Sequence, residues 1–333
     1  MLDIFNSDAF AVRPLTDTIN KIKFKPSRLS ELGIFQGSGV ATTSIAIEEK
    51  AGILKLVSPS PRGGPGTTIG KERRTLRSLT IPHFELNDAV MAEEVQGVRA
   101  WGSETDVETV QNKVAEKMAV HVASHEVTSE YSKLGAVKGI VTYADGTTLD
   151  LFTTFGVSAA AAVSLELDAA TPVGGVLRKT IAGVIRGMQD ALGGVPLGAV
   201  HALVGADFFD ALIQHSEVRD TYLGWVQAEE LRKGYAYGGF PFGGVFWEEY
   251  RGSVDGTAFV AANEAHVFPV GIPGLFRTVW APADYKETVN TIGQRFYAKQ
   301  YDMPNGKGVH FDTQTNELNF CTRPNALRKC TLT

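Results

Sequence analysis

The sequence predicts an α+β fold built around one long helix, with extended segments before it and mixed helices and strands after it. The helix is the clearest feature, because apolar residues recur at spacings of three and four and form one stripe. These residues are Val107, Val110, Val114, Met118 and Val122. Strand-like runs at 43–57 and 67–86 precede it, and short strands follow residue 173. Because only one side is apolar, the helix is expected to lie across a sheet.

The composition favours an ordinary globular protein that does not bind nucleic acid tightly. The 333 residues suffice for one large domain or two modest ones, and 44% of them are hydrophobic against 21% charged. The formal net charge is -5, whereas proteins that grip phosphates usually carry a basic excess. Any contact with DNA is therefore expected to be weak or local.

The first 85 residues read as an arm followed by a flap. Residues 1–43 contain Pro14 and Pro26 and lack sustained periodicity, which predicts an extended arm. Residues 44–85 form two strand-like runs joined by the Gly- and Pro-rich segment 58–66. A two-stranded ribbon is marginally stable alone, so this flap is expected to rest on another surface, which could be a neighbouring subunit, and its tip to become ordered on assembly.

The long helix is expected to span residues 104–134. Ser103 with Asp106 resembles a capping box at its start, and Gly135 suits its end. At ~1.5 Å per residue such a helix is about 45 Å long. It would serve as a spine for the surrounding sheet.

The remaining chain predicts alternating short elements. Residues 137–157 read as a hairpin around Asp145-Gly146, and Val176–Leu192 as an amphipathic helix. An apolar strand at His201–Val204 leads to Asp207, a candidate N-cap for the next helix. Further short strands are expected at Val245–Trp247, Ala258–Ala261 and His266–Val270.

Two charge runs of opposite sign flank the end of the flap. Each run alone is most simply a solvated face. We hypothesise instead that they meet between subunits, because an extended flap carries its charges away from its own body. The candidate contact residues are Arg62, Lys71, Arg73, Arg74 and Arg77 on the basic side, and Glu85, Glu93 and Glu94 on the acidic side.

No catalytic, cofactor-binding or metal-binding residues are predicted. His121 and His125 stand at i and i+4, but the zincin pattern needs Glu where Val122 stands, so an ordinary polar helix face is the simpler interpretation. The stretch 64–71 departs from the phosphate-loop pattern, and neither Gly-x-Ser-x-Gly nor a strand-linked Gly-x-Gly-x-x-Gly occurs. The sequence therefore predicts a protein that is not an enzyme.

The remaining motifs favour a soluble, reduced protein. Cys321 and Cys330 are too few for a disulfide framework, and no uncharged stretch reaches the roughly 18 apolar residues of a membrane span. The start of the chain lacks the pattern of a secretory signal. The aromatic, Gly-rich run 235–244 is expected to be a loop that packs at a contact, with ligand stacking as the alternative.

Several segments, in this order, resemble the lambda-like family of phage major capsid proteins, "major capsid protein E", over nearly the whole chain. The order and spacing of the segments carry the resemblance, since no one of them is a signature. They are Arg73–Arg77 through Ile81–Phe84, Glu94–Arg99 into Gly102–Glu104, Gly205–Leu212, Phe268–Gly271, Ala281–Tyr285 and Asn319–Pro324.

The resemblance implies the HK97-like capsid fold, with an N-terminal arm, an extended E-loop, a P domain with a spine helix and an A domain. It places the arm at 1–43, the E-loop at 44–85 and the P domain at 86–172. The A domain is placed at 173–281, and residues 282–333 return to the P domain.

The implied function is a structural subunit that assembles into the icosahedral shell around a phage genome. Implied partners are other copies of the chain, in hexamers and pentamers, and the portal, scaffolding and decoration proteins, with no membrane. The implied location is the virion, after assembly in the host cytoplasm. Two alternatives stay open: an encapsulin-like compartment, told apart by enzyme cargo, and a soluble α/β enzyme, which would need a pocket of convergent titratable groups.

Overall fold

The computed structural model describes residues 28–51, 73–96, 110–169, 172–194, 197–223, 239–254 and 257–333. Several sequence predictions lie outside these ranges. They are residues 1–27 of the arm, the flap tip 58–66, the contact candidates Arg62 and Lys71, and the expected helix start at 104–109 with its capping box of Ser103 and Asp106.

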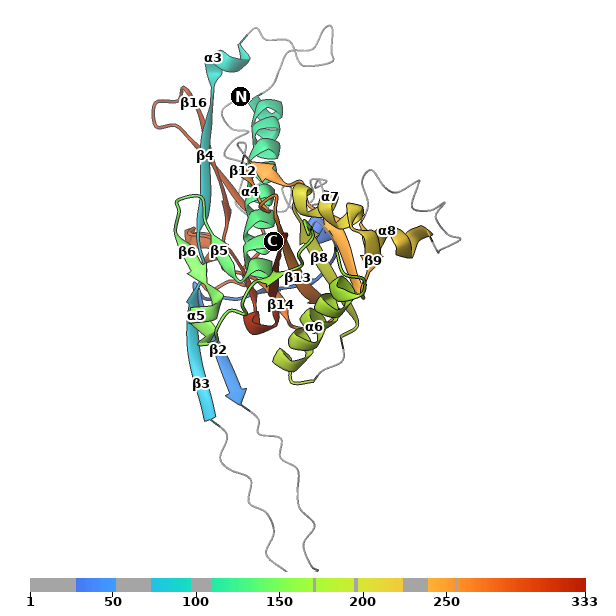
Figure 1. Ribbon diagram of the computed structural model, residues 1–333. Coiled ribbons are helices and arrows are strands. Elements are labelled where there is room, and N and C mark those ends of the chain that lie inside the picture. The colour runs from blue at the N-terminus through green and yellow to red at the C-terminus, as the bar shows by residue number, and fades with distance from the viewer. Residues whose placement is uncertain are drawn as a thin grey trace, which may run out of the picture.

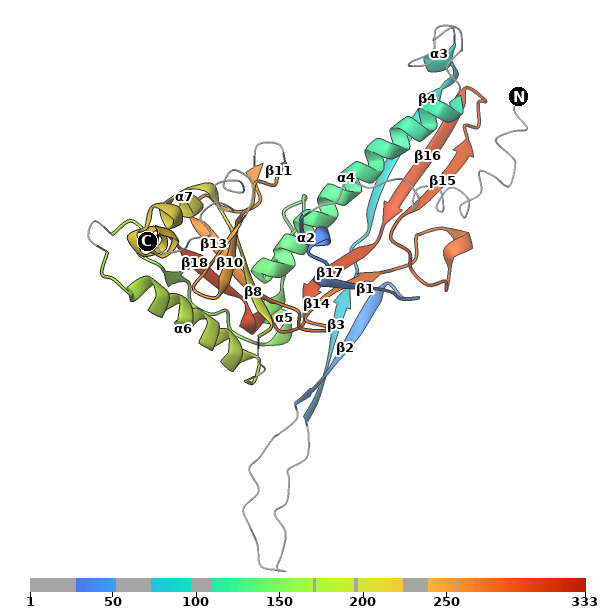
Figure 2. The same ribbon diagram turned by 90° about the vertical axis from the view of Figure 1, so that its right-hand side faces the viewer.

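The spine helix α4 (Val110–Lys138) lies along the strands that surround it, as Figure 2 shows. Its predicted stripe is confirmed over the described residues, because Val114, Met118 and Val122 are buried, whereas Val107 lies outside them. The helix ends four residues later than predicted, at Lys138, where Gly139 takes a φ of +87°. Gly135 is not its cap. A Cβ there would come within 2.7 Å of the Val141 Cα, so glycine is needed for the close approach of the next strand.

Two three-stranded sheets pack against the spine helix. One has the order β15-β16-β4 and the other β1-β14-β17. Helix α4 contacts β4, β16 and β17, so it bridges the two sheets. Their strands are β1 (Phe35–Gly39), β4 (Phe84–Met91), β14 (Phe276–Trp280), β15 (Tyr297–Asp302), β16 (Gly308–Thr315) and β17 (Glu317–Cys321).

A six-stranded mixed sheet forms a lobe beside the spine (Figure 2). Helices α6 (Val176–Ala191) and α7 (Ala206–Gln214) pack on one face, against Ala202 and Val267. The other face, with Leu203 and Phe268, joins the core around the end of α4. In sheet order the strands are β7 (Val163–Ser164), β18 (Arg328–Thr331), β13 (Glu264–Val270), β8 (Ala199–Val204), β10 (Val245–Glu249) and β9 (Phe240–Phe242).

Two helix ends in this lobe bear on the predictions. Helix α6 ends where predicted, with Gly193 and Gly194 at positive φ after it. The N-cap of α7 is Gly205 and not Asp207. A Cβ at Gly205 would lie 2.1 Å from the Ala261 carbonyl oxygen, so the close approach of that backbone places a glycine at the cap.

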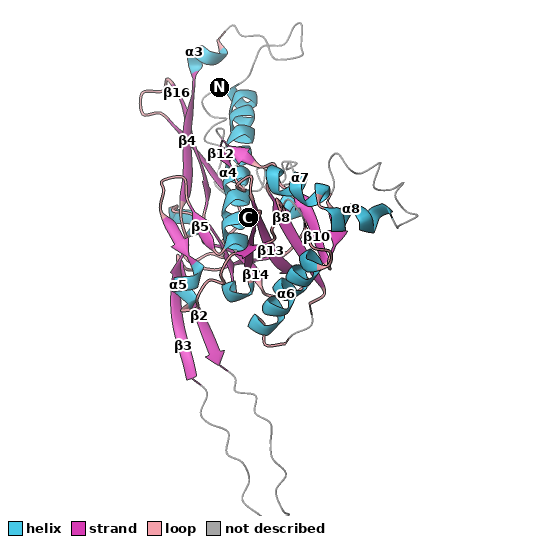
Figure 3. Cartoon of the chain, viewed as in Figure 1, coloured by secondary structure: helices cyan, strands magenta, loops and turns pink. Residues whose placement is uncertain are grey.

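The flap consists of β2 (Ser44–Ala51) paired with β3 (Arg73–Thr80) and projects from the body (Figures 1 and 3). The predicted run 67–86 is interrupted after Thr80, and β4 starts at Phe84 in a different sheet. Pro82 lies in this break. Because proline cannot donate to a strand ladder, it suits the passage from one sheet to the next.

The predicted hairpin at 137–157 is shorter than expected. Strands β5 (Ile140–Thr142) and β6 (Thr148–Asp150) pair around the Asp145-Gly146 turn. The chain then forms helix α5 (Leu151–Phe155), because the Asp150 side chain accepts hydrogen bonds from the Phe152 and Thr153 N–H groups and caps it.

The described part of the aromatic run is a hairpin of β9 and β10. Phe240 and Phe242 are buried in the lobe's own core, and the Trp247 indole donates to the Phe242 carbonyl at 3.0 Å. These rings are therefore not a contact surface. The smaller elements are α2 (Arg28–Glu31), α3 (Ala92–Val95), α8 (Ser216–Leu223), β11 (Ser253–Val254), β12 (Thr257–Ala258), η3 (Lys286–Thr288) and η4 (Pro324–Ala326).

Strand pairing links the segments on either side of residue 281. Strand β14 lies before this residue and pairs with β1 and β17 beside the spine. Strand β18 lies after it and pairs with β13 in the lobe. The chain therefore passes between the lobe and the sheets beside the spine more than once.

Candidate assembly surfaces and the junction pocket

The root of the flap is anchored to its own subunit. Arg77 Nη1 donates to the Thr154 carbonyl of α5 at 2.6 Å, and Leu79 is buried in the core. Gly156, at φ +62°, leaves room for this guanidinium, since a Cβ there would lie 3.0 Å from Arg77 Nη2. Arg77 therefore has an intrachain role, whereas Arg73 and Arg74 lie farther along β3 toward the flap tip.

Several acidic candidates have partners within the chain. Glu94 accepts a hydrogen bond from the Met91 N–H at 3.1 Å, and its other oxygen lies 3.3 Å from Lys117 Nζ. The Met91 bond, more than the Lys117 charge, lowers the pKa of Glu94. Glu85 lies 3.3 Å from His83 Nε2. Glu93 is exposed on α3.

The structure does not bring the acidic candidates together. Glu85 and Glu93 stand at opposite ends of β4, about 25 Å apart at ~3.3 Å per residue. Figure 1 places α3 at one end of the molecule and the flap at the other. One flap therefore cannot meet both acidic sites at once, and the exposed Glu93 is the better candidate.

A buried polar network joins α4 to the two adjacent sheets. Glu317 is 3% exposed and accepts hydrogen bonds from Ser129 at 2.6 Å and from the Trp280 indole at 3.0 Å. Asn319 donates to Glu317 and to Ser132 Oγ, and accepts from Thr278. Since each buried polar group is satisfied by its neighbours, this network specifies how the helix sits on the strands.

The two spine histidines are buried or nearly so, which corrects the expectation of an ordinary polar helix face. His121 Nδ1 and His125 Nε2 lie 2.9 and 3.1 Å from the same Thr313 hydroxyl on β16. Burial lowers the pKa of His121, and lowers that of His125 to about 4. In the described ranges, no three His, Cys, Asp or Glu side chains gather where they could hold a metal.

Both cysteines are free and buried in separate clusters. Cys321 lies in the core shared by the spine and the lobe, and Cys330 in the core under α6. Burial raises the pKa of each thiol to about 12, so neither is a reactive thiolate. Over the residues that the structure covers, no helix is both long and apolar enough to cross a membrane.

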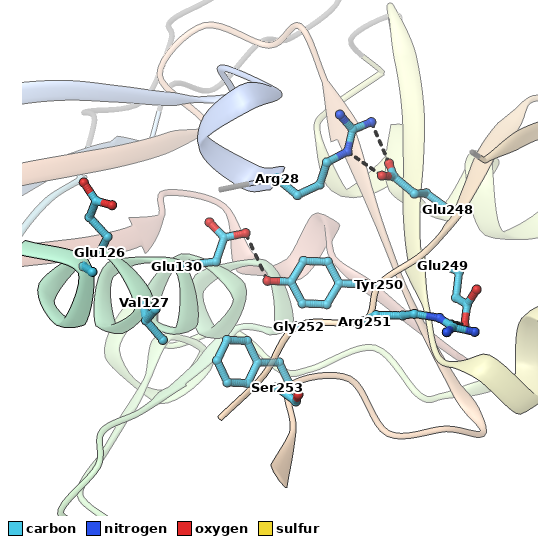
Figure 4. A pocket seen from close by; sticks show the side chains of 12 residues that line it. Arg28, Glu126, Val127, Glu130, Glu248, Glu249, Tyr250, Arg251, Gly252 and Ser253 are labelled. Atoms are coloured by element: carbon cyan, nitrogen blue, oxygen red, sulfur yellow. Dashed lines mark hydrogen bonds and ion pairs between the residues drawn. The ribbon is translucent and has the colours of Figure 1, made fainter. Parts of the chain in front are cut away.

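A pocket of about 480 Å³ lies where the spine helix, α2 and the β10–β11 segment meet, as Figure 4 shows. On one side the Arg28 guanidinium contacts both oxygens of Glu248, which also lies 2.9 Å from His201 Nε2. On the other side Tyr250 donates to Glu130 at 3.0 Å. Burial raises the pKa of Glu126, which also lines the pocket, to about 7.

The sequence interpretation missed this pocket, because its lining comes from three distant segments. The sequence of the spine helix nevertheless contains one indication of the pocket. Val114, Met118 and Val122 are followed at the same spacing of four by Glu126 and Glu130. The two carboxylates therefore continue a buried stripe, and a charged residue in such a position is unusual enough to mark a site.

A long helix across a sheet, a two-stranded flap and a lateral α/β lobe together define the HK97-like capsid class of shell-forming proteins. Solved structures support this fold. The chain matches the capsid of the cyanophage P-SCSP1u with a TM-score of 0.56 at 11% identity, covering 93% of this chain and 89% of that one. It matches the capsid of the Myoviridae phage XM1 with a TM-score of 0.50 at 14% identity, covering 93% and 94%.

The sequence comparisons identify the family. Residues 11–332 match the model of the phage major capsid protein E family, and the chain belongs to that family. The major capsid protein of Pseudomonas phage KPP10 is 29% identical over 90% of both chains. That of Salmonella phage Felix O1 is 26% identical over 98% of this chain and 97% of the relative. The predicted fold and function are confirmed: the protein is a structural subunit of a phage head shell that assembles from copies of itself, and the encapsulin alternative has less support.

Proposed function

We propose that neighbouring subunits contact each other head to tail, with Arg73 and Arg74 of one flap on Glu93 and Glu94 of the next subunit's α3. The observation that supports this contact is the position of flap and α3 at opposite ends of one subunit (Figure 1). Two different faces that are complementary form a heterologous contact, which closes into rings. We propose hexamers and pentamers as those rings.

We also assign the other parts of the molecule to the domains of the HK97-like fold. The flap corresponds to the E-loop, the spine and its two sheets to the P domain, and the six-stranded lobe to the A domain. Portal, scaffolding and decoration proteins are proposed as partners, and assembly is proposed to take place in the host cytoplasm. The net charge of -5 supports only weak binding of the packaged DNA.

Charge reversal tests the contact. Replacing Arg73 and Arg74 by Glu should leave the subunit folded and melting as before, yet stop or greatly weaken shell formation. Exposed ion pairs contribute only about 0 to 1 kcal/mol each, but a shell repeats them many times. High salt should weaken assembly of the unchanged protein in the same direction.

A matched control carries the same change of net charge elsewhere. Lys179 and Arg186 are exposed on α6, so their double replacement by Glu should leave assembly intact. Assembly is measured by electron microscopy and sedimentation. If the flap variant builds normal particles at normal protein concentration, the basic run is merely a solvated edge.

We further propose that the protein has no enzymatic activity and binds no metal stoichiometrically. His121 and His125 share one threonine hydroxyl in a buried setting, which supports a structural role. Elemental analysis should find far less than about one zinc per chain. A stoichiometric zinc that disappears when both histidines are replaced would contradict this.

A further inference from the structure

The junction pocket contains two buried carboxylates that each keep an oxygen without a partner. Glu126 is 7% exposed and Glu130 6%. Glu130 Oε1 accepts from the Leu29 N–H and from Tyr250, both at 3.0 Å. In the described part of the chain, Glu130 Oε2 and Glu126 Oε1 have no hydrogen-bond partner. Buried charged oxygens without donors are costly, so the site is suited to a cationic donor.

The pocket also offers apolar surface beside these carboxylates. Val127 and Phe259 line it together with the ring of Tyr250. In Figure 4, Glu126 and Glu130 rise from one side of α4, while Val127 points to the other side. A ligand that combines an ammonium group with an apolar body would complement both parts.

The cations that line the pocket already contact other carboxylates. Arg28 is engaged with Glu248, and Arg251 lies 2.7 Å from Glu249. These guanidinium groups contact the carboxylates of β10. The charges of Arg295 and Lys133 act on Glu126, and that of Lys133 also on Glu130, yet in the described part of the chain Glu126 Oε1 and Glu130 Oε2 still accept no hydrogen bond.

The sequence directly before Arg28 has the complementary chemistry. It contains Lys21, Lys23 and Lys25, with Phe24 among them. Arg28 itself lines the pocket, so the preceding residues enter the described chain at its edge. An extended chain spans at most about 3.4 Å per residue, so Lys25 can reach about 10 Å and Lys23 about 17 Å from Arg28.

We propose that the Lys21–Lys25 segment of the same chain docks into this pocket, placing a lysine ammonium against Glu126 and Glu130 and Phe24 against Val127 and Phe259. The arm is thereby fixed at the junction of spine and lobe. Burial raises the pKa of Glu126 to about 7, and a docked ammonium would lower it, because a nearby positive charge stabilises the ionised carboxylate.

Limited digestion of the full-length free subunit with trypsin tests the proposal. Trypsin cleaves after Lys21 and Lys23, whereas Pro26 blocks cleavage after Lys25. Docking should protect both sites, and Glu126→Gln with Glu130→Gln should raise the cleavage rate roughly tenfold, since charge-assisted bonds are lost while the side-chain shape is kept. Glu116→Gln, on the exposed face of α4, is the control and should leave the rate unchanged.

A second measurement uses the unmodified protein, in case the double variant folds poorly. A carbodiimide should join a lysine of 21–25 to Glu126 or Glu130, and mass spectrometry identifies the linked peptides. Mixing isotope-labelled with unlabelled subunits distinguishes the two sources of the lysine. Links within one copy support the proposal. Links between copies, or no link together with unchanged trypsin rates in the variant, overturn it.

Discussion

The buried histidines of the spine show how single residues tie the helix to β16. His125 is 3% exposed and contacts the Thr313 hydroxyl, with His121 one turn away. Burial disfavours its charged form and lowers its pKa from 6.5 to about 4. The unfolded chain therefore takes up a proton at a higher pH than the folded one. The stability contributed by neutral His125 is present above about pH 6.5 and is lost as pH falls toward 4.

This shift predicts a pH dependence that one substitution should reduce. Between pH 7.5 and 5 the protein should lose about 2 kcal/mol more free energy of unfolding than the His125→Gln variant. Glutamine can still reach Thr313 but does not titrate. Urea unfolding at both pH values measures the difference. Equal losses in the two proteins would show that His125 is protonated at its ordinary pKa.

Polar residues also explain why the sequence interpretation missed part of the core. Residues 313–317 and Asn319 are buried, although their Thr, Gln, Asn and Glu side chains suggest a solvated tail. Their burial depends on partners far along the chain, such as Ser129 and Ser132 on α4. Hydrophobic pattern cannot reveal a buried residue whose burial is made possible by a distant hydrogen bond.

At the level of elements, helices with a periodic hydrophobic pattern were predicted well. Helix caps and strands that depend on tertiary contacts were not. The stripe of α4 and the extent of α6 follow from their own residues. In the sequence, Gly135 resembled a helix C-cap and Asp207 an N-cap. In the structure, the close approach of Val141 requires a glycine at 135, and that of Ala261 requires one at the N-cap Gly205. Most of strand β4 escaped prediction for a similar reason. The predicted run ended at Leu86, and the partner strand β16 lies more than 200 residues away.

Two helical glycines provide a test of that distinction. Alanine usually stabilises a helix by up to about 1 kcal/mol relative to glycine. At Gly135 the new Cβ would meet the Val141 backbone, so Gly135→Ala should lower the free energy of unfolding by about 1 to 3 kcal/mol.

Gly183 on α6 is the matched control for Gly135. A Cβ at Gly183 meets nothing within 4 Å, so Gly183→Ala should raise the free energy of unfolding by about 0.5 to 1 kcal/mol. Denaturant titration of both variants gives the comparison. A stabilising Gly135→Ala would mean that the strand after α4 does not approach as closely as described.

The whole molecule is a body with two unlike extensions. The lobe and the spine share the core around Leu203 and Phe268, so the body should behave as one unit. The flap and α3 leave it in opposite directions (Figure 1). Most residues of the flap and α3 whose burial the structure describes are exposed or half-buried, so both extensions offer contact surface to neighbouring copies.

The proposed head-to-tail contact makes a prediction about ring size. One variant carries Arg73→Glu and Arg74→Glu on its flap. The other carries Glu93→Lys and Glu94→Gln on α3, because glutamine keeps the hydrogen bond to the Met91 N–H. Each variant alone places like charges together at every contact, so neither should assemble.

In a mixture, each variant fits only the other, so the two must alternate around a ring. Alternation closes without a mismatch only when the number of subunits is even. The mixture should therefore form hexamers but fail at pentamers, which a closed icosahedral shell requires. Electron microscopy should show hexameric rings or open sheets in place of closed heads. Closed particles of normal size from the mixture, or particles from either variant alone, would contradict the proposed pairing of the flap with α3.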